Sequence, residues 1–434
     1  MAREANVVVS YAPRQHLVRT PTARDWARFD YYAPRVRRFG DRRYPSCREQ
    51  GAVKRYGAVL ELLSESRPHL LPNVRECVLD LTEHPASPPL YRLYLGPTLA
   101  SIHIKANHDD PHLSPLHSEL AALCPHIQHL TLASPNPTSP GALPPDLHAS
   151  VLALLLALHS LRTISSTYTI PLPPRTIAHL AAQSSLTTLA TIYVPASAVG
   201  AFAAARFSGL HTLHMRTDDW AAAARIVRSA ASGALTSLAV ECAEPAEPRR
   251  AVHSLLEALR RASSGTLAAV RLESRQPAAD APDNDDAAAG PEARDVVRPL
   301  LSCTQLRSVT LGLRFLEALD DAWLAEAAGA WPHLEHLDLL PAAAAPPCVP
   351  RSPGMTLRGV VSLVRDFPRV REIRLPLSLH DARVSVWDYV PTGHIRSLAL
   401  AHPPLQKGAL DGLNLWLVFP KLLYYRADHI TQLG

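Results

Sequence analysis

One short phrase, with apolar residues in the order apolar-x-x-apolar-x-apolar, recurs along most of the chain. The stretches CPHIQHLTLAS, TQLRSVTLGL, WPHLEHLDLL and FPRVREIRLP all contain it. A single variable residue separates its second and third apolar positions, which is the period of a β-strand with one buried face. Each phrase therefore predicts one short strand. The thirteen copies are Val74/Cys77/Leu79, Leu99/Ile102/Ile104, Ile127/Leu130/Leu132, Leu161/Ile164/Ser166, Leu189/Ile192/Val194, Leu210/Leu213/Met215, Leu235/Leu238/Val240, Leu267/Val270/Leu272, Leu306/Val309/Leu311, Leu334/Leu337/Leu339, Val370/Ile373/Leu375, Ile395/Leu398/Leu400 and Leu422/Tyr425/Ala427.

The intervals between the phrases have a different period. Apolar residues recur at helical spacing in residues 116–124, 195–207, 220–230, 249–262, 321–330 and 357–367. In 249–262, for example, Val252, Leu255, Leu256 and Leu259 form one stripe, and the arginines lie largely on the other side. Each repeating unit is therefore predicted to be one strand followed by one helix.

The spacing of the phrases predicts how these units assemble. Successive copies begin 21 to 39 residues apart, and most intervals are close to the ~20–29 residues of a leucine-rich repeat. One strand and one helix cannot bury their shared apolar face alone, but stacked units bury it continuously. We therefore predict an α/β leucine-rich-repeat solenoid, with a curved parallel sheet inside and helices outside. The alternative, a doubly wound sheet, requires longer all-apolar strands and does not repeat a phrase.

The ends and the longest interval set the predicted domain boundaries. Residues 1–69 form a basic segment, in which Trp26, Phe29, Tyr32 and Val36 are spaced as on a short helix that caps the first repeat. Residues 70–434 form the solenoid of about 13 repeats. An acidic, Ala- and Pro-rich insertion, residues 277–295, is predicted to be disordered. Counted from Asp283, Asp285 or Asp286, it does not combine a Gly and a Glu at the offsets that a calcium-binding loop requires.

The phrases and the segment before them resemble a known family. Several phrases follow an aromatic residue or Cys and then Pro (CPHI, WPHL, FPRV, FPKL), and TPTARDWARFDYYAPRVRRF precedes them. Both features resemble the leucine-rich-repeat region of fungal F-box proteins. The resemblance implies a substrate-recognition part of an SCF-type ubiquitin ligase, with a ligase adaptor as partner. The F-box itself is not visible, so either it was lost or the sequence is truncated. The usual Asn ladder is also almost absent, with only Asn107 at its position.

Cysteine use and hydropathy predict the compartment. The six cysteines are scattered without a C-x-x-C pair, and Cys77, Cys124 and Cys303 fall on or beside apolar repeat positions. A reduced intracellular chain, cytoplasmic or nuclear, is therefore expected. The first residues lack an apolar core of signal-peptide length, and the run at 151–158 is too short to span a bilayer. No membrane association is expected.

The sequence offers little support for catalysis or cofactor binding. Only 18 glycines are present, and phosphate-binding loops need glycine near the anion. No G-x-S-x-G or Cys/His signature occurs, so we predict that the protein is not an enzyme and binds no cofactor or metal. The segment NHDDPHLSPLH holds His108, His112 and His117, but Pro111 interrupts it, so a solvated turn is favoured over a zinc site.

Polar positions on the strands are the predicted partner site. Side chains alternate along a strand, so residues flanking the second and third apolar positions point to the concave surface. This mixed row of His, Arg and Asp or Glu suits a protein partner, although any exposed strand face must be polar. The predicted concave partner surface comprises His103, Lys105, His129, His214, Arg216, Glu241, Arg271, Glu273, His336, Asp338, Arg374 and Arg426.

Two other functions are left open by the sequence. One is a stand-alone leucine-rich-repeat scaffold. The other is nucleic-acid binding through the N-terminal basic patch, in which Arg35, Arg37, Arg38, Arg42 and Arg43 alternate with aromatic residues. Since the aromatic spacing there is also that of a packed helix, a protein partner is favoured over nucleic acid.

Overall fold

The structure is a computed structural model that describes residues 22–39, 70–82, 91, 93–134, 143–168, 170–230, 235–243, 249–274, 291–340, 354–376, 395–401 and 424–428. The chain divides into two compact units, Met1–Ile170 and Pro171–Gly434. Both units are built from short parallel strands, each paired with the next strand in sequence.

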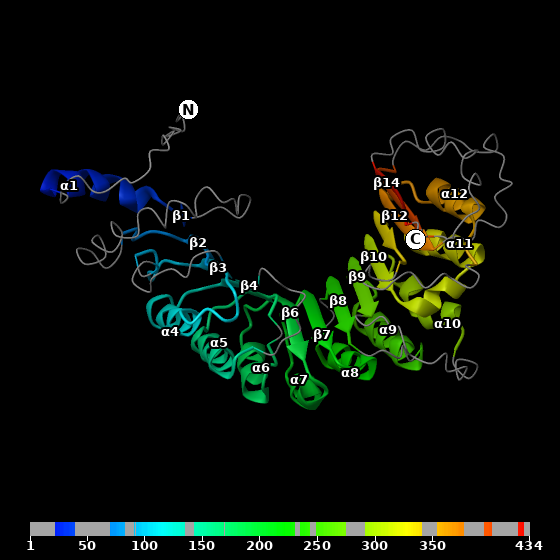
Figure 1. Cartoon of the computed structure of the whole chain (residues 1–434). Coiled ribbons are helices and arrows are strands. Elements are labelled where there is room, and N and C mark those ends of the chain that lie inside the picture. The colour runs from blue at the N-terminus through cyan, green and yellow to red at the C-terminus, as the bar shows by residue number, and fades with distance from the viewer. Residues whose placement is uncertain are drawn as a thin grey trace, which may run out of the picture. The chain divides into compact units, whose positions relative to one another are not determined.

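In the described part of the first unit, short paired strands form one layer and helices another (Figure 1). Its strands are β1 (Arg38–Phe39), β2 (Glu76–Asp80), β3 (Ser101–Lys105), β4 (His129–Ala133) and β5 (Thr163–Ser166). Its helices are α1 (Ala23–Tyr32), the 3-10 turn Ala33–Arg35, α4 (Leu113–Leu123) and α5 (Pro145–Ala157).

The second unit repeats the same alternation over a longer stretch. Its strands are β6 (Thr188–Val194), β7 (Thr212–Thr217), β8 (Ser237–Cys242), β9 (Ala269–Ser274), β10 (Ser308–Gly312), β11 (His336–Asp338), β12 (Glu372–Pro376), β13 (Ser397–Ala401) and β14 (Tyr424–Asp428). Its helices are α6 (Pro174–Ala181), α7 (Val199–Ala204), α8 (Trp220–Ala230), α9 (Arg249–Ser263), α10 (Ala293–Val297), α11 (Asp321–Ala330) and α12 (Leu357–Asp366), with 3-10 turns at Ala196–Ala198, Arg298–Ser302 and Arg314–Ala318.

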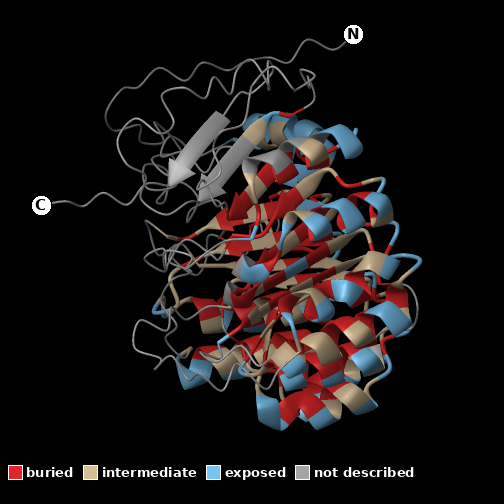
Figure 2. Cartoon of the chain, turned by 90° about the vertical axis from the view of Figure 1, so that its right-hand side faces the viewer, coloured by how far each residue is buried: buried red, intermediate tan, exposed pale blue. Residues whose placement is uncertain are grey.

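This arrangement confirms the predicted fold class: the chain is an α/β leucine-rich-repeat solenoid. Equivalent apolar residues of successive phrases stand side by side, as Leu213, Leu238, Val270, Val309 and Leu337 do across β7 to β11. These five side chains are at most 1% exposed. Burying each one contributes about 1.5–3 kcal/mol relative to leaving it in water. The buried residues lie between the strands and the inner sides of the helices (Figure 2).

The aromatic-Pro and Cys-Pro phrases mark the ends of helices. Cys124, Trp331 and Phe367 are the C-cap residues of α4, α11 and α12, and each backbone N–H donates to a carbonyl four residues earlier. The Pro that follows disfavours helical backbone at the residue before it, which ends the helix there. All three cap side chains are at most 1% exposed. The phrase therefore turns the chain from a helix into the next strand and fills the core at that corner.

The register of β6 corrects the predicted fifth phrase. Leu189 pairs with Leu213 and Ile192 pairs with Met215, with a register shift between them. Leu189 is therefore the second apolar residue of its repeat, not the first, and the first is Leu186, which is 1% exposed. An extra residue in this strand makes a β-bulge. The bulge lengthens the spacing between the second and third apolar residues by one, so the phrase was assigned to the wrong residues.

Where the Asn ladder is otherwise missing, Asn107 and a tyrosine donate hydrogen bonds to the ends of the strands. Asn107 donates from Nδ2 to the Thr82 carbonyl of the preceding repeat at 3.2 Å. The Tyr168 hydroxyl lies within 2.9 Å of the Ala106 carbonyl and 3.3 Å of the Ala133 carbonyl. A single phenol thus supplies a hydrogen-bond donor to the backbone where these two strands end.

Replacing Tyr168 with Phe tests this role. Tyr168 is 7% exposed, so the Ala106 carbonyl would lose this donor without gaining free access to water, whereas the Ala133 carbonyl keeps the Ala106 backbone N–H at 3.0 Å. We expect the free energy of unfolding to fall by about 1–3 kcal/mol. Urea denaturation followed by circular dichroism measures the change. A neutral result would show that water or another donor satisfies the Ala106 carbonyl.

The N-terminal segment differs in part from its prediction. Helix α1 begins with a capping box formed by Thr22 and Asp25, and none of its residues is buried. Tyr32 is 52% exposed, and Val36 lies beyond the helix, so the predicted apolar stripe does not continue through them. Strand β1 pairs in parallel with β2, so one strand precedes the first copy of the recurring phrase.

Two further segments require correction. Residues 277–290 of the predicted disordered insertion lie outside the described residues, but α10 begins at Ala293, so the last three residues of that prediction are helical. The segment 107–117 is not a solvated turn throughout, because α4 begins at Leu113 and His117 is 2% exposed. Pro115 is compatible with the helix because it lies in the first turn.

Two observations bear on the compartment. Cys77, Cys124, Cys242 and Cys303 are buried as free thiols. Within the described ranges, no helix is both long enough and apolar enough to cross a bilayer.

Candidate partner-binding site

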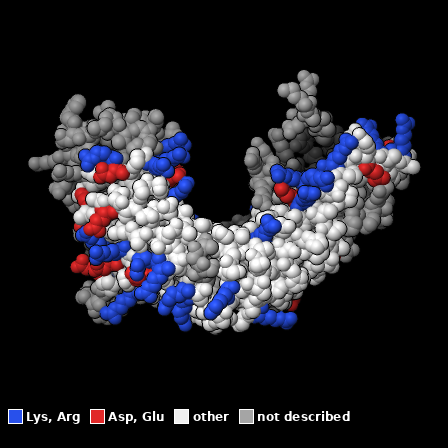
Figure 3. All heavy atoms as spheres, turned by 180° about the vertical axis from the view of Figure 1, so that it is seen from behind, with Lys and Arg blue, Asp and Glu red and all other residues white. Residues whose placement is uncertain are grey.

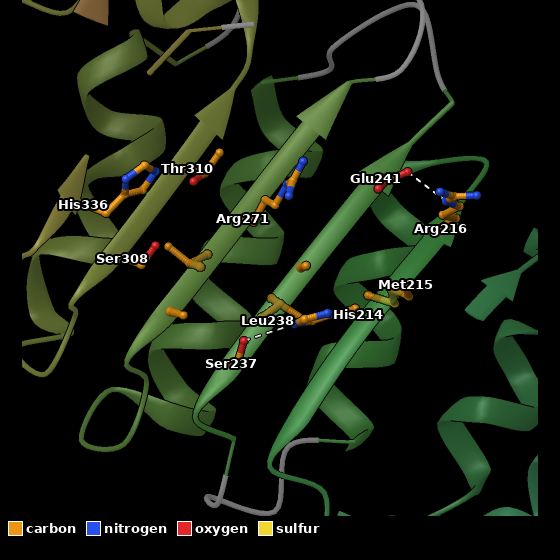
Figure 4. Close-up of a pocket in the computed structure, with 13 residues that line it drawn as sticks. His214, Met215, Arg216, Ser237, Leu238, Glu241, Arg271, Ser308, Thr310 and His336 are labelled. Carbon is orange, nitrogen blue, oxygen red and sulfur yellow. Dashed lines mark hydrogen bonds and ion pairs between the residues drawn. The ribbon is translucent and has the colours of Figure 1, made fainter. Parts of the chain in front are cut away.

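A hollow of about 400 Å³ lies on the polar face of the sheet in the second unit, across β7 to β11 (Figure 4). Its floor exists because the side chains there are small. Ser237, Ala269 and Ser308 are register partners on β8, β9 and β10, and Ala239 lies two residues along β8. Larger side chains at the surrounding positions form the walls.

One wall is formed by residues of β7 and β8. The His214 Nε2 lies 3.2 Å from the Ser237 hydroxyl, and the Arg216 Nε donates to Glu241 at 2.8 Å. Burial, followed by the positive charge of Arg271, lowers the pKa of His214. His214 is therefore a neutral hydrogen-bonding group at pH 7, and the net charge of this wall is close to zero.

Arg271 reaches over the floor from β9. Its Nη2 donates to Glu273 at 2.8 Å. The Arg271 side chain is 56% exposed, whereas that of Glu273 is only 14% exposed. The hydrogen bond to Glu273 is the main cause that raises the pKa of Arg271, so the guanidinium is charged at any physiological pH.

His336 of β11 closes the far side of the hollow, and beyond it the polar face continues onto β12. His336 Nδ1 lies 2.9 Å from a Glu372 carboxylate oxygen. Arg374 donates to Asp338 at 2.6 Å, and the Asp338 side chain is 7% exposed against 37% for Arg374. Burial is the main cause that raises the pKa of Asp338. Asp338 also accepts from the Leu340 backbone N–H at 3.0 Å. Its carboxylate therefore holds both the Arg374 side chain and the backbone just after β11.

The sheet register brings many of the predicted site residues together. His214, Ala239, Arg271, Thr310, Asp338 and Arg374 are successive register partners, which we call the middle row. His103 and Lys105 lie on β3 and His129 on β4, all in the first unit. Arg426 lies on β14, but its side chain is outside the described part of the structure. Asp338 is buried, so its carboxylate does not form part of the accessible surface.

Some residues of the site were not predicted. Ser237, Ser308 and Thr310 line the hollow, and Glu372 pairs with His336. All four occupy the same alternating strand positions as the predicted residues, so the rule that found the others also covers them. The small uncharged residues did not indicate a binding site in the sequence. A hollow forms only where several small side chains become neighbours on adjacent strands, and the sequence of one strand does not show its neighbours.

The three described arginines of the N-terminal basic patch each contact another group of the molecule. Arg35 lies 4.0 Å from the centre of the Tyr31 ring, Arg37 donates to the Asn73 carbonyl at 3.4 Å, and Arg38 pairs with Glu76 at 3.1 Å. Arg42 and Arg43 lie outside the described residues. On the side shown in Figure 3, basic and acidic side chains both occur, separated by broad uncharged areas.

Among the described residues, no group of three His, Cys, Asp or Glu side chains is placed to hold a metal ion. His112 is the N-cap residue of α4, and His117 is buried in that helix beside Ser150.

Comparison with known proteins adds little to this description. No family model matches the chain, and no curated protein matches it. A leucine-rich repeat-containing protein of known structure, LegL7 from Legionella pneumophila, is 14% identical with a TM-score of 0.37. The match covers 71% of this chain and 93% of that one. Because the TM-score is low, the fold assignment rests on the strands and their register.

Proposed function

We propose that the chain is a non-enzymatic protein-interaction module that binds an intracellular protein partner on the polar sheet face of its second unit. The observation that carries the proposal is the hollow over β7 to β11, which is lined by hydrogen-bonding and charged side chains. Solenoids commonly use an extended strand face of this kind to bind partners.

The charge pattern favours a protein over a nucleic acid. Three arginines of this face, Arg216, Arg271 and Arg374, are each paired with a carboxylate. A surface that tracks a phosphate backbone needs an excess of positive charge, because affinity comes from neutralising phosphates. Alternating opposite charges instead match the mixed surface of a protein and fix its register.

A finer proposal concerns the process in which the module acts. The aromatic-Pro and Cys-Pro phrases and the segment 20–39 resemble the leucine-rich-repeat region of fungal F-box proteins. On that basis the partner on the sheet face is a substrate of an SCF-type ubiquitin ligase. Recovery of a ligase adaptor with the full-length natural protein would support this role, whereas partners without an adaptor would support a stand-alone scaffold.

A substitution that fills the hollow tests the proposal that this face binds a protein partner. Ala239→Arg places a long side chain on the floor, and we expect loss of the partners that cross-link to the wild-type protein in cells. The matched control is Ala221→Arg on the exposed side of α8, which adds the same charge to the helix layer. Cross-linking with mass spectrometry compares the partners of the three proteins. If Ala239→Arg retains every partner, the hollow is not the binding site.

A further inference from the structure

The ion pairs of the middle row do not expose their two charges equally. Arg271 is 56% exposed above Glu273 at 14%, and Arg374 is 37% exposed above Asp338 at 7%. In both pairs the carboxylate is the more buried partner and accepts from the guanidinium, which is the more exposed one. The formal charges balance, but the groups available to a partner along this row are positive.

The surroundings of Arg271 suit an oxyanion. Its ion pair uses one terminal nitrogen, and a guanidinium has five N–H donors in all. The hydroxyls of Ser308 and Thr310 line the hollow on the next strand and can also donate. Ala239 and Ala269 leave space beside it for a side chain of the partner. Arginine and carboxylate form charge-assisted hydrogen bonds, which are stronger than those between neutral groups.

The register gives the distance between the two exposed arginines. Arg271 pairs with Thr310, Thr310 with Asp338, and Asp338 with Arg374, so three strand intervals separate them. At about 4.8 Å per interval the separation is about 14 Å. An extended chain advances about 3.4 Å per residue, so about four residues span this distance.

We propose that the middle row binds an extended acidic segment of the protein partner, with one carboxylate on Arg271 and a second, four residues along, on Arg374. This inference rests on the proposed function, because it names the ligand of the same face. The segment crosses the strands and places the first acidic side chain in the hollow.

Neighbouring acidic residues restrict where this segment lies. Glu372, two residues before the middle-row residue Arg374 on β12, is 56% exposed and is paired with His336. Glu241, two residues beyond the middle-row residue Ala239 on β8, is 26% exposed, and its ion-pair partner Arg216 is 13% exposed. Like charges repel at such sites, so the partner's carboxylates must lie on the middle row itself.

Selection from a random library of 12-residue peptides displayed on phage tests the proposal. The immobilised full chain is expected to enrich peptides with two acidic residues four positions apart. Arg271→Ala and Arg374→Ala should each weaken binding of a selected peptide by about 10- to 100-fold. Arg271→Glu should instead select a basic residue at one of the two positions. Arg307→Ala is the control, because Arg307 is exposed on the approach to β10 but lies off the middle row.

The outcomes separate this inference from the function on which it rests. Peptides without acidic residues that bind Arg271→Ala and Arg374→Ala normally, but not Ala239→Arg, would overturn the acidic ligand and leave protein binding intact. If no peptide is enriched and Ala239→Arg retains the cellular partners, both proposals are wrong. Circular dichroism of each variant confirms that it is folded.

Discussion

Replacing Trp331 with Ala is expected to lower the free energy of unfolding by about 3–5 kcal/mol, as removal of a fully buried aromatic side chain does. Trp331 is 0% exposed at the end of α11. Its Nε1 donates to the Leu300 carbonyl at 3.0 Å, and its ring meets that of Trp323 edge-on with centroids 5.8 Å apart. The substitution therefore removes core volume, a ring contact and a hydrogen bond at one corner of a repeat.

Trp331→Phe separates these contributions. Phe retains an aromatic ring in the core but has no N–H, so the Leu300 carbonyl loses its donor. We expect a smaller loss, about 1–3 kcal/mol. Urea denaturation followed by circular dichroism compares the two variants with the wild type. If Trp331→Ala costs less than about 1 kcal/mol, the aromatic-Pro phrase does not fill the core as described.

The second large effect is a loss of stability as pH falls from about 6.5 to 4, caused by His117. Burial lowers the pKa of His117 from 6.5 to about 4. Between these pH values the unfolded state binds a proton that the folded state does not. The contribution of His117 to the free energy of unfolding is therefore complete above pH 6.5 and is lost as the pH falls to 4. A shift of this size corresponds to about 3 kcal/mol.

The hydrogen bonds of His117 fix its neutral form. Ser150 Oγ donates to the Leu147 carbonyl at 2.9 Å, so it accepts from His117 Nδ1, which lies 2.9 Å away. Nδ1 therefore carries the proton of the neutral ring. A second proton would place a charge in the core between α4 and α5, where nothing in the described surroundings is seen to pair with it.

Two substitutions test the assignment. His117→Gln should remove most of this pH dependence between pH 6.5 and 4, whatever its effect on stability at pH 7. His126→Gln changes an exposed histidine just beyond the same helix and should leave the dependence unchanged. Urea denaturation at a series of pH values measures both. Equal slopes for wild type and His117→Gln would contradict the account.

Sequence periodicity predicted the strands because their apolar residues must be buried in every repeat. Leu213 and Leu337, for example, have the same role in different repeats and carry the same pattern. The prediction was wrong at Leu189, where a bulge adds a residue that no local pattern reveals. His117 was misplaced because Pro111 suggested a loop throughout residues 107–117, whereas α4 begins at Leu113, two residues after that proline.

The candidate site was predictable only in part. Alternation along the strands identified Arg271, Glu273, Asp338 and Arg374 as residues of one face. It could not show that Asp338 is buried under Arg374, since exposure depends on which side chain lies above the other. The hollow was equally invisible, because it exists only where Ala239, Ala269 and Ser308 become neighbours across three strands.

The most direct test of the repeat register is a pair of engineered cysteines. Ser237 and Ala269 are register partners on adjacent strands, with an expected Cα separation of about 5 Å that a disulfide can bridge. Ser237 and Ser308 are two strands apart, at about 10 Å, which is too far. Peptide mapping after mild oxidation should find the bond in Ser237→Cys/Ala269→Cys and not in Ser237→Cys/Ser308→Cys. The reverse pattern, or no bond in either, would contradict the stacking of equivalent positions on which the fold and the site both depend.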